Sequence, residues 1–415
     1  MTSDQLSQRL RTVEEHQAFL LEGIAPLSVV EVPLLESVGQ VLARDVVAPW
    51  PLPSFDNSSM DGYAVIAADV AAASTGAPVV LEVRGDLAAG GTSASEVVPG
   101  TALRIMTGAP MPAGADAVIP VEATDAGVDV VTISAPVREG ACIRRAGEDI
   151  AAGTVVLTAG TRLTERSLPL LAAVGNVTAP VYRRPRVVVI STGDELVEPG
   201  TPLTHGLISD SNGVMLVACA REAGAEAERA PLVRDEAVEF RAALASAAAV
   251  ADIIVTSGGV SMGAYDTVKE VLRESGTVEF AKVAMHPGMP QGGGRVRGVP
   301  IVTLPGNPVS SFISFELFVR PMIRVMMGHA DLVRATEPAV CVEAVGSSAN
   351  KRQYARAMLT VDADGGRRVQ PVGGQGSHMM GGLAQSDCLI VIPVGVERVE
   401  AGQSVEVIDL MREAP

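Results

Sequence analysis

The clearest pattern of apolar and polar positions lies between Arg186 and Pro321. Short β-branched runs alternate there with segments whose apolar residues recur at helical spacing. The predicted strands are Val187–Ile190, Glu226–Leu232, Ile253–Val255 and Ile301–Leu304, and the predicted helices are Gly213–Ala223, Asp235–Ala249, Asp266–Ser275 and Pro308–Met327. Asp235 is a suitable N-cap for its helix. Strands that alternate with helices of about 10–15 residues predict a doubly wound, mostly parallel sheet.

The other segments are shorter. Residues 4–23 have helical spacing, and a second helix is predicted for Leu34–Leu42, although Gly39 weakens it. From residue 54 to residue 139, strand-like segments are separated by Gly, Pro and Asp turns, which indicates a β-rich module. Short alternating segments after Gly328 predict a C-terminal β-barrel or sandwich. The predicted fold class is therefore multidomain α/β plus β.

Composition narrows the possible classes of protein. The chain has 415 residues and a net charge of −16 without a basic run, which argues against a broad nucleic-acid-binding face. No apolar run reaches about 18 residues, so no transmembrane helix is expected. The N-terminus lacks the apolar region of a signal peptide, and the four cysteines form no CxxC pair. We therefore expect a cytoplasmic protein with reduced thiols that binds neither nucleic acid nor membrane.

Two turns of the α/β region are suited to binding an oxyanion. Each follows a predicted strand and precedes a helix, so backbone N–H groups and a positive helix end converge there. The candidate binding residues are Ser257, Gly258, Gly259 and Ser261 in the first turn and Pro305, Gly306, Asn307 and Pro308 in the second. Either turn alone could be an ordinary connection. Two such turns at the carboxyl ends of strands in one domain favour an anion site.

Four further stretches combine carboxylates, hydroxyls and basic side chains. They are Phe55–Ala64, Arg104–Pro110, Ile143–Asp149 and Ser191–Leu196. Carboxylates near oxyanion turns suit Mg²⁺, which bridges them to phosphate oxygens. Arg144 and Arg145 could clamp an anion, and Lys282 could supply a point charge for phosphate. Each stretch taken alone could equally be an Asx-rich turn or a solvated charged surface.

Several common catalytic patterns are missing from the sequence. It contains no HExxH, no Cys/His cluster and no readable Ser-His-Asp arrangement. It also has neither GxGxxG after a strand nor GxxxxGK[ST], so dinucleotide and P-loop interpretations are weak. Metal binding by His286 or His378 is not expected, because both histidines are isolated in the sequence.

The order of the motifs is more specific than any one of them. The motifs are FDNSSMDGYA, RIMTGAPMPAGADAVIP, IRRAGEDI, STGDEL, SDSNG, TSGGVSMG-x-x-D and LPGNPVS. In this order the chain resembles the MoeA family of molybdopterin molybdenumtransferases, to which the gephyrin E domain is related. The resemblance covers residues 8 to 410. It implies a homodimer with four domains, namely a discontinuous linker and dimerisation domain (1–50 and 140–180), an inserted β-rich domain (51–139), a doubly wound molybdopterin-binding α/β domain (181–330) and a C-terminal β-barrel (331–415).

The resemblance also implies a reaction and its residues. Adenylylated molybdopterin and molybdate would give molybdenum cofactor and AMP, with Mg²⁺ required. The matching functional positions are Asp61, Thr107, Asp149, Glu195, Asp235, Asp266 and Lys282, together with Pro305 and Pro308. We expect Glu195, Asp235 and Asp266 to be the metal ligands, in a site between the third domain of one subunit and the second domain of the other. Molybdopterin adenylyltransferase and acceptor molybdoenzymes are expected partners.

One segment departs from the family pattern. Many relatives have Lys-x-x-x-Lys-Pro-Gly-Lys-Pro, whereas this chain has His286 and Met289 at the second and third lysine positions. We expect a less positive oxyanion pocket in which His286 binds an anion only when protonated. The following Gln291-Gly292-Gly293-Gly294 is rich in glycine, and we expect it to become ordered only with ligand.

Three alternatives compete with molybdenum insertion. The first is the preceding adenylyl-transfer step, whose enzyme shares the α/β fold but is normally a compact single domain. The second is a scaffold protein, as in the receptor-clustering role of gephyrin. The third is a paralogue that handles tungsten, or a degenerate member of the family. Retention of the acidic positions opposes degeneracy.

Overall fold

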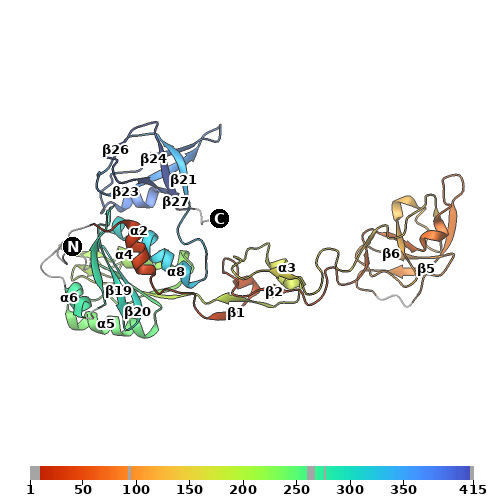
Figure 1. The fold of residues 1–415 in the computed structure, drawn as a ribbon, viewed down its shortest axis with the longest axis horizontal. Helices are drawn as coiled ribbons and strands as arrows, with labels where there is room; N and C mark the ends of the chain where they lie inside the picture. Colours follow the sequence, from red (N-terminus) through yellow and green to blue (C-terminus); the bar gives the residue numbers. More distant parts are fainter. Residues whose placement is uncertain (1–9, 92–94, 259–266, 275–276, 412–415) are drawn as a thin grey trace. The chain divides into compact units, whose positions relative to one another are not determined.

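The computed structural model describes residues 10–91, 95–258, 267–274 and 277–411 (Figure 1). These residues form two compact units, each described here by itself. The α/β-barrel unit holds the described residues up to Glu31, Gly39–Ala43 and the chain from Pro180 onward. The β-rich unit holds Val32–Val38 and Arg44–Ala179. The four-domain division expected from sequence stays a prediction.

A six-stranded sheet organises the α/β part of the first unit. Its order is β15-β12-β16-β20-β19-β17, with the strands at Glu226–Arg229, Arg186–Ser191, Ile253–Ser257, Val299–Leu304, Pro290–Val296 and Glu279–Lys282. The first four strands are parallel, whereas β19 and β17 are antiparallel to their neighbours. The prediction of a mostly parallel sheet is therefore confirmed, with an antiparallel extension at one edge.

Helices cover both faces of this sheet (Figure 1). The helices are α4 (Ser211–Glu222), α5 (Ala237–Val250), α6 (Thr267–Glu274), α7 (Pro308–Ser314) and α8 (Arg320–Met326), and a π-helical turn at Phe315–Val319 joins the last two. Val187 and Val189 of β12 pack in one core with Leu216 of α4. Ile190 of the same strand packs in a second core with Phe240 of α5. Alternate residues of one strand thus supply two cores, which is the arrangement of a doubly wound fold.

The C-terminal part of this unit is a closed barrel, as predicted. Its strands are β21 (Thr336–Cys341), β23 (Arg352–Val361), β24 (Arg367–Pro371), β25 (Cys388–Ile392) and β27 (Ser404–Asp409), with the short strands β22 (Val345–Gly346) and β26 (Arg398–Val399) and helix α9 (Met380–Gln385) beside them. The barrel closes because β23 pairs with both β24 and β25. The short strand β18 (Met285–His286), which precedes the barrel in sequence, also pairs with β23.

The β-rich unit contains a five-stranded sheet of order β7-β4-β6-β5-β8. These strands lie at Ala117–Pro120, Gly62–Val65, Thr101–Ile105, Val79–Leu87 and Val130–Ile133. Shorter elements are β2 (Val46–Val47), β3 (Asn57–Ser58), β9 (Ile143–Arg144), β10 (Val155–Leu157), α3 (Leu168–Ala173) and the 3₁₀ turns Ala67–Val70 and Val121–Ala123. Tyr63, Leu81 and Ile133 lie in its core.

The elements not yet named are short. They are α2 (Val13–Leu21), β1 (Val29–Pro33), the 3₁₀ turn Leu34–Glu36, β11 (Thr178–Tyr182), β13 (Leu196–Val197) and β14 (Ile208–Ser209). Helix α2 starts with a capping box in which Thr12 and Glu15 bond each other's backbone N–H. Among the described residues, no helix is both long and apolar enough to cross a membrane.

Two helix predictions need correction. Only Leu34–Glu36 of the predicted helix Leu34–Leu42 is helical, and Gly39 has a φ of +83°, which a right-handed helix does not allow. Helix α5 starts at Ala237 rather than Asp235, and its N-cap Glu236 makes no side-chain hydrogen bond to it. Asp235 therefore does not cap this helix.

The glycine-rich segment is also ordered differently from our expectation. Gln291–Gly294 lies within β19, which pairs with β17 on one side and β20 on the other. A Cβ on Gly292 would lie 2.1 Å from Thr303 Oγ1, and one on Gly293 would lie 2.2 Å from Leu20 Cδ2. Close packing against β20 and α2 requires these glycines, so they do not indicate a loop that waits for ligand.

Candidate functional site

The two turns proposed to bind an oxyanion lie side by side at the carboxyl edge of the sheet. Strands β16 and β20 are parallel neighbours, and Gly258 N–H donates to Leu304 O at 3.1 Å. A Cβ on Gly306 would lie 3.8 Å from Gly258 Cα, so the two backbones nearly touch. Gly258 has a φ of +97°, which favours glycine. The structure therefore brings Ser257 and Gly258 close to Pro305–Pro308, whereas Gly259 and Ser261 lie outside the described residues.

Asn212 joins these two turns. Its amide Nδ2 donates to Ser257 Oγ at 2.8 Å and to Gly306 O at 2.6 Å. Asn212 lies in the first turn of α4, two residues after the N-cap Asp210. Its motif, SDSNG, belongs to the family pattern, but residue type alone does not distinguish a bridging asparagine from one that caps a helix locally.

The barrel contacts the second turn from its other side. Asn307 Nδ2 donates to Ser377 Oγ at 3.0 Å, and Val309 N–H donates to Ser377 O at 3.1 Å. The loop that carries Ser377 is held by Arg356, which is fully buried and donates to the carbonyls of Gly374, Gly376 and Met379. A buried guanidinium thus organises a loop that supports the turn.

The acidic turn after β12 provides exposed carboxylates. Glu195 and Asp235 are both exposed, and Asp235 N–H donates to Asp194 Oδ1 at 3.2 Å. Asp194 is therefore a neighbour of the predicted ligands that the sequence analysis did not single out. Asp266 lies outside the described residues. No group of three or more His, Cys, Asp or Glu residues is placed to hold a metal in the described part of the chain, so the predicted metal set stays a prediction.

Lys282 and His286 lie on different sheets. Lys282 is exposed at the end of β17, and its carbonyl accepts from Arg11 N–H at 2.9 Å. His286 is half-buried in β18, where burial and, to a smaller extent, nearby Lys351 lower the pKa of its imidazole. His286 Nδ1 is buried, and it has no hydrogen-bond partner among the residues that the structure describes. Around neutral pH the imidazole is therefore uncharged, and it becomes a cation only in acid.

In the β-rich unit, three motif segments lie together. Gly108 N–H donates to Ser58 O at 2.8 Å, and β3 pairs with β9. Asp61 Oδ1 accepts both Thr107 N–H at 2.7 Å and Thr107 Oγ1–H at 2.8 Å. These two bonds, the backbone one first, lower the pKa of Asp61. Asp61 is thus a stable carboxylate on an exposed surface.

The third of these segments holds Arg145 in an ion pair. Arg145 Nη1 pairs with Asp56 Oδ2 at 2.6 Å, and Ala146 N–H donates to Asp56 Oδ1 at 2.8 Å. Arg145 is therefore engaged by a carboxylate of the same unit. Asp149 is exposed, and its N–H donates to Leu52 O at 3.1 Å.

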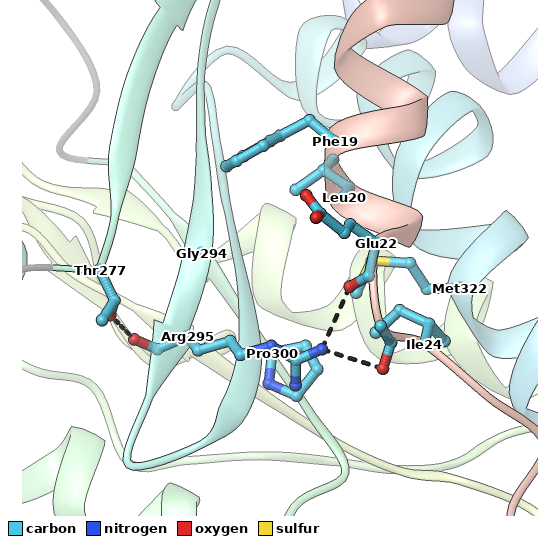
Figure 2. A pocket seen from close by; sticks show the side chains of 10 residues that line it. Phe19, Leu20, Glu22, Ile24, Thr277, Gly294, Arg295, Pro300 and Met322 are labelled. Carbon is cyan, nitrogen blue, oxygen red and sulfur yellow. Dashed lines mark hydrogen bonds between the residues drawn. The ribbon is translucent and has the colours of Figure 1, made fainter.

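One cavity of about 370 Å³ lies beside helix α2 in the α/β-barrel unit (Figure 2). Its walls include Phe19 and Leu20 of α2, Met322 and the β19 residue Arg295. Figure 2 shows Arg295 reaching the end of α2, where Nη2 donates to the carbonyls of Glu22 at 3.2 Å and Gly23 at 3.1 Å. No predicted site residue in the described part of the chain lines this cavity, which marks the junction of α2 with the sheet.

Comparisons with known protein families agree with this architecture. Residues 11–175 match the MoeA N-terminal region (domain I and II), and residues 338–410 match the MoeA C-terminal region (domain IV). Residues 188–325 match a family described as a probable molybdopterin binding domain. The three matched regions follow one another along the chain.

Whole-length relatives give the same result. The chain is 48% identical to molybdopterin molybdenumtransferase 2 of Mycobacterium tuberculosis, over 97% of this chain and 100% of that protein. It is 36% identical to molybdopterin molybdenumtransferase of Haemophilus influenzae, over 95% and 98% of the two chains. A solved molybdopterin biosynthesis MoeA protein from Pyrococcus horikosii superposes with a TM-score of 0.84 at 32% identity, covering 97% and 99%. The chain is a transferase enzyme that belongs to the MoeA family of molybdopterin molybdenumtransferases.

Proposed function

We propose that this enzyme inserts molybdenum from molybdate into adenylylated molybdopterin, which releases AMP and forms molybdenum cofactor in a Mg²⁺-dependent reaction. The family assignment supports a role in molybdenum cofactor biosynthesis, with molybdopterin and molybdate as substrates. The finer proposal rests chiefly on one observation: Asn212 ties two oxyanion-type turns together beside a turn with exposed carboxylates.

The paired turns suit the anionic part of such a substrate. Helix α7 starts at Pro308, directly after the second turn, so its positive end faces the same edge. Ser257 Oγ accepts from Asn212, which leaves the hydroxyl hydrogen of Ser257 to donate to a substrate oxygen. In this proposal Ser257, Gly258 and the Pro305–Pro308 turn bind and orient the phosphate-bearing end of the substrate, and Lys282 adds positive charge.

The acidic turn fits the proposed requirement for Mg²⁺. Mg²⁺ usually takes one or two protein carboxylates together with substrate phosphate oxygens and water, so it does not need a cluster of three acids. Exposed carboxylates at Glu195 and Asp235 meet this requirement, and Asp266 is the third predicted ligand. When bound, the metal would neutralise charge on the pyrophosphate group.

The β-rich unit would contribute carboxylates to the reaction. From the described residues, Asp61 receives hydrogen bonds only on Oδ1, so Oδ2 is available to a water or a substrate proton. Thr107 fixes the orientation of the Asp61 carboxylate, and exposed Asp149 adds a further negative group. We propose that this surface acts together with the α/β turns of a second subunit in a homodimer. We further propose a cytoplasmic location, with molybdopterin adenylyltransferase as donor and molybdoenzymes as acceptors.

A turnover assay tests this proposal. Purified enzyme is mixed with adenylylated molybdopterin and Mg²⁺, with or without molybdate or tungstate, and released AMP is measured. We expect AMP release that requires both Mg²⁺ and molybdate. Release with tungstate alone would favour the tungsten-handling alternative. Consumption of ATP with free molybdopterin would favour adenylyl transfer, and binding without any release would favour a scaffold.

A further inference from the structure

We infer that Asn212 is a positioning residue of the substrate site: it fixes the spacing of the two oxyanion-type turns and directs the Ser257 hydroxyl hydrogen toward the substrate. This inference rests on the proposed function, because it assigns a role in binding that same substrate. It adds a residue that is neither an acid nor a member of either turn.

The contacts restrict the distance between the turns. Ser257 Oγ lies 2.8 Å and Gly306 O lies 2.6 Å from the same nitrogen, Asn212 Nδ2. The two oxygens therefore cannot be farther apart than the sum of these distances. Gly258 N–H also donates to Leu304 O at 3.1 Å, so a backbone bond and a side-chain bridge connect the same two turns.

The chemistry of the partners fixes the orientation of the amide. Gly306 O is a carbonyl and can only accept a hydrogen bond, so the atom 2.6 Å from it must be the nitrogen of Asn212 and not its oxygen. The second N–H of the same group then donates to Ser257 Oγ. Ser257 is consequently an acceptor toward Asn212, and its own hydrogen must point elsewhere.

The side chain is held at a rigid place. The N-cap Asp210 is almost completely buried and accepts from Ser191 Oγ at 3.0 Å, Gly213 N–H at 2.8 Å and Arg229 Nη1 at 2.8 Å. These bonds attach the start of α4 to β12 and β15. Asn212 extends this attachment to β16 and to the turn after β20, so one helix end fixes the ends of four neighbouring strands.

Asn212 also has an unused acceptor. Its Oδ1 is buried, and none of the described residues donates a hydrogen bond to it. A buried acceptor without a donor is unfavourable, so a bound N–H group or a water that donates to this oxygen would be stabilised. A pterin ring carries N–H donors of this kind, and a free oxyanion does not. This contact would favour the pterin-bearing substrate over an inorganic anion at the same edge.

Asn212→Asp is the most informative variant, because it keeps the shape of the side chain and replaces its N–H donor by an oxygen that can only accept. A carboxylate would face Gly306 O without a hydrogen and would accept the Ser257 hydrogen intended for the substrate. We expect kcat/KM for adenylylated molybdopterin to fall about 100-fold, mainly through KM, and about 10-fold in Asn212→Ala. Asn176→Asp is the control, since Asn176 donates to Leu171 O in the β-rich unit, and it should stay within about twofold of wild type.

A double-mutant cycle separates positioning from general damage to the fold. If Asn212 acts through Ser257, then Ser257→Ala should lose much less activity in the Asn212→Ala background than in wild type. The inference would be overturned if the losses of the two single variants simply added in the double variant, or if Asn212→Asp kept its activity within about twofold of wild type. Wild-type enzyme that releases no AMP would instead refute the proposed function, so the two failures are distinguishable.

Discussion

The turns of the α/β-barrel unit and the acidic segments of the β-rich unit are built in opposite ways. In the first, the polar side chains that shape the turns are buried: Asp210 is 1% exposed, Ser257 is 3% exposed and Arg356 is 0% exposed. In the second, Asp61, Thr107 and Asp149 are all exposed. Buried hydrogen bonds hold the backbone of the α/β turns in place, whereas the segments of the β-rich unit present their carboxylates to solvent.

This difference indicates a division of labour. Buried polar groups are costly to leave without partners, so the α/β turns are held rigidly and changes there should alter both stability and substrate binding. Exposed carboxylates contribute little to folding, so changes at Asp61 or Asp149 should affect chemistry with little effect on stability. The following predictions test this contrast, from the largest expected effect to the smallest.

Asp61→Asn should give the largest loss. The amide keeps the size of the carboxylate and can still accept from Thr107 N–H, but it cannot accept a proton or balance positive charge. We expect AMP release to fall about 10³-fold and the melting temperature to change by less than about 2 °C.

Asp125→Asn is the matched control for this change. Asp125 is also an exposed carboxylate of the β-rich unit, and it accepts from Thr132 N–H at 2.8 Å. We expect it to keep activity within about twofold of wild type. If Asp61→Asn retained more than about a tenth of the activity, Asp61 would not belong to the reacting site.

Acid should destabilise the α/β-barrel unit through His16. This imidazole is fully buried between Phe19 and Phe318, and burial, with a smaller contribution from Arg11, lowers its pKa from 6.5 to about 4. The folded state binds the proton more weakly than the unfolded state, so stability is present above pH 6.5 and is lost as pH falls toward 4. Lowering the pH from 7.5 to 4.5 should therefore reduce the free energy of unfolding by about 2.5 kcal/mol through this group.

The measurement is the free energy of unfolding at both pH values. The loss of stability in acid should be smaller in His16→Leu than in wild type, and the difference should be that same amount. The control His205→Gln, at an exposed site, should behave as wild type does. Equal acid sensitivity in wild type and His16→Leu would show that His16 is not the buried base. Asp61, whose pKa is below the usual value, should stay charged over the same range.

Gly292→Ala tests the close packing of β19. The new methyl group would lie 2.1 Å from Thr303 Oγ1 and 2.9 Å from the Phe280 ring, both in the sheet that carries the turns. We expect a loss of about 2 kcal/mol in the free energy of unfolding. The control is Gly346→Ala in β22, where a Cβ meets nothing within 4 Å, and its effect should be below about 0.5 kcal/mol. Equal stability of the two variants would contradict this packing argument.

His286→Lys should give the smallest effect. Because burial and Lys351 lower the pKa of His286, this position carries a charge only in acid. Wild-type affinity for molybdate should therefore rise about fivefold from pH 8 to pH 5.5, whereas the lysine variant should bind equally well at both. A flat profile in wild type combined with a pH-dependent profile in His286→Lys would exclude His286 from the anion pocket.

The sequence predicted the fold well where the physical signal is local. Apolar runs such as Val187–Ile190 became buried strands, and Pro308 started a helix directly after a rigid turn. Prediction from sequence failed where the same local residue pattern is compatible with two different structures. Asp235 has the chemistry of an N-cap, but α5 starts two residues later, and the glycines of β19 reflect packing against Thr303 and Leu20 rather than flexibility.

The site was predictable only in part for a related reason. Turns at strand ends can be recognised because strand and helix patterns flank them, which is how Ser257 and Pro305–Pro308 were selected. Asn212 contacts Ser257, which is 45 positions away in sequence, and Gly306, which is 94 positions away. The periodicity of apolar residues does not indicate such long-range contacts. Asp194 and Ser377 were missed for the same reason, since their partners are set by tertiary structure.

Mixed dimers test most directly whether the two differently built regions form one site across two subunits. Asp61→Asn chains and Asn212→Asp chains would be mixed, dissociated and reassembled, and AMP release would be measured at a substrate concentration below the wild-type KM, where each variant alone is nearly inactive. Random reassembly makes half of the dimers mixed. If each site combines the β-rich unit of one subunit with the α/β turns of its partner, one of the two sites in each mixed dimer contains neither substitution. The mixture should then recover about a quarter of wild-type activity. Recovery no greater than the average of the two parent variants would contradict this account.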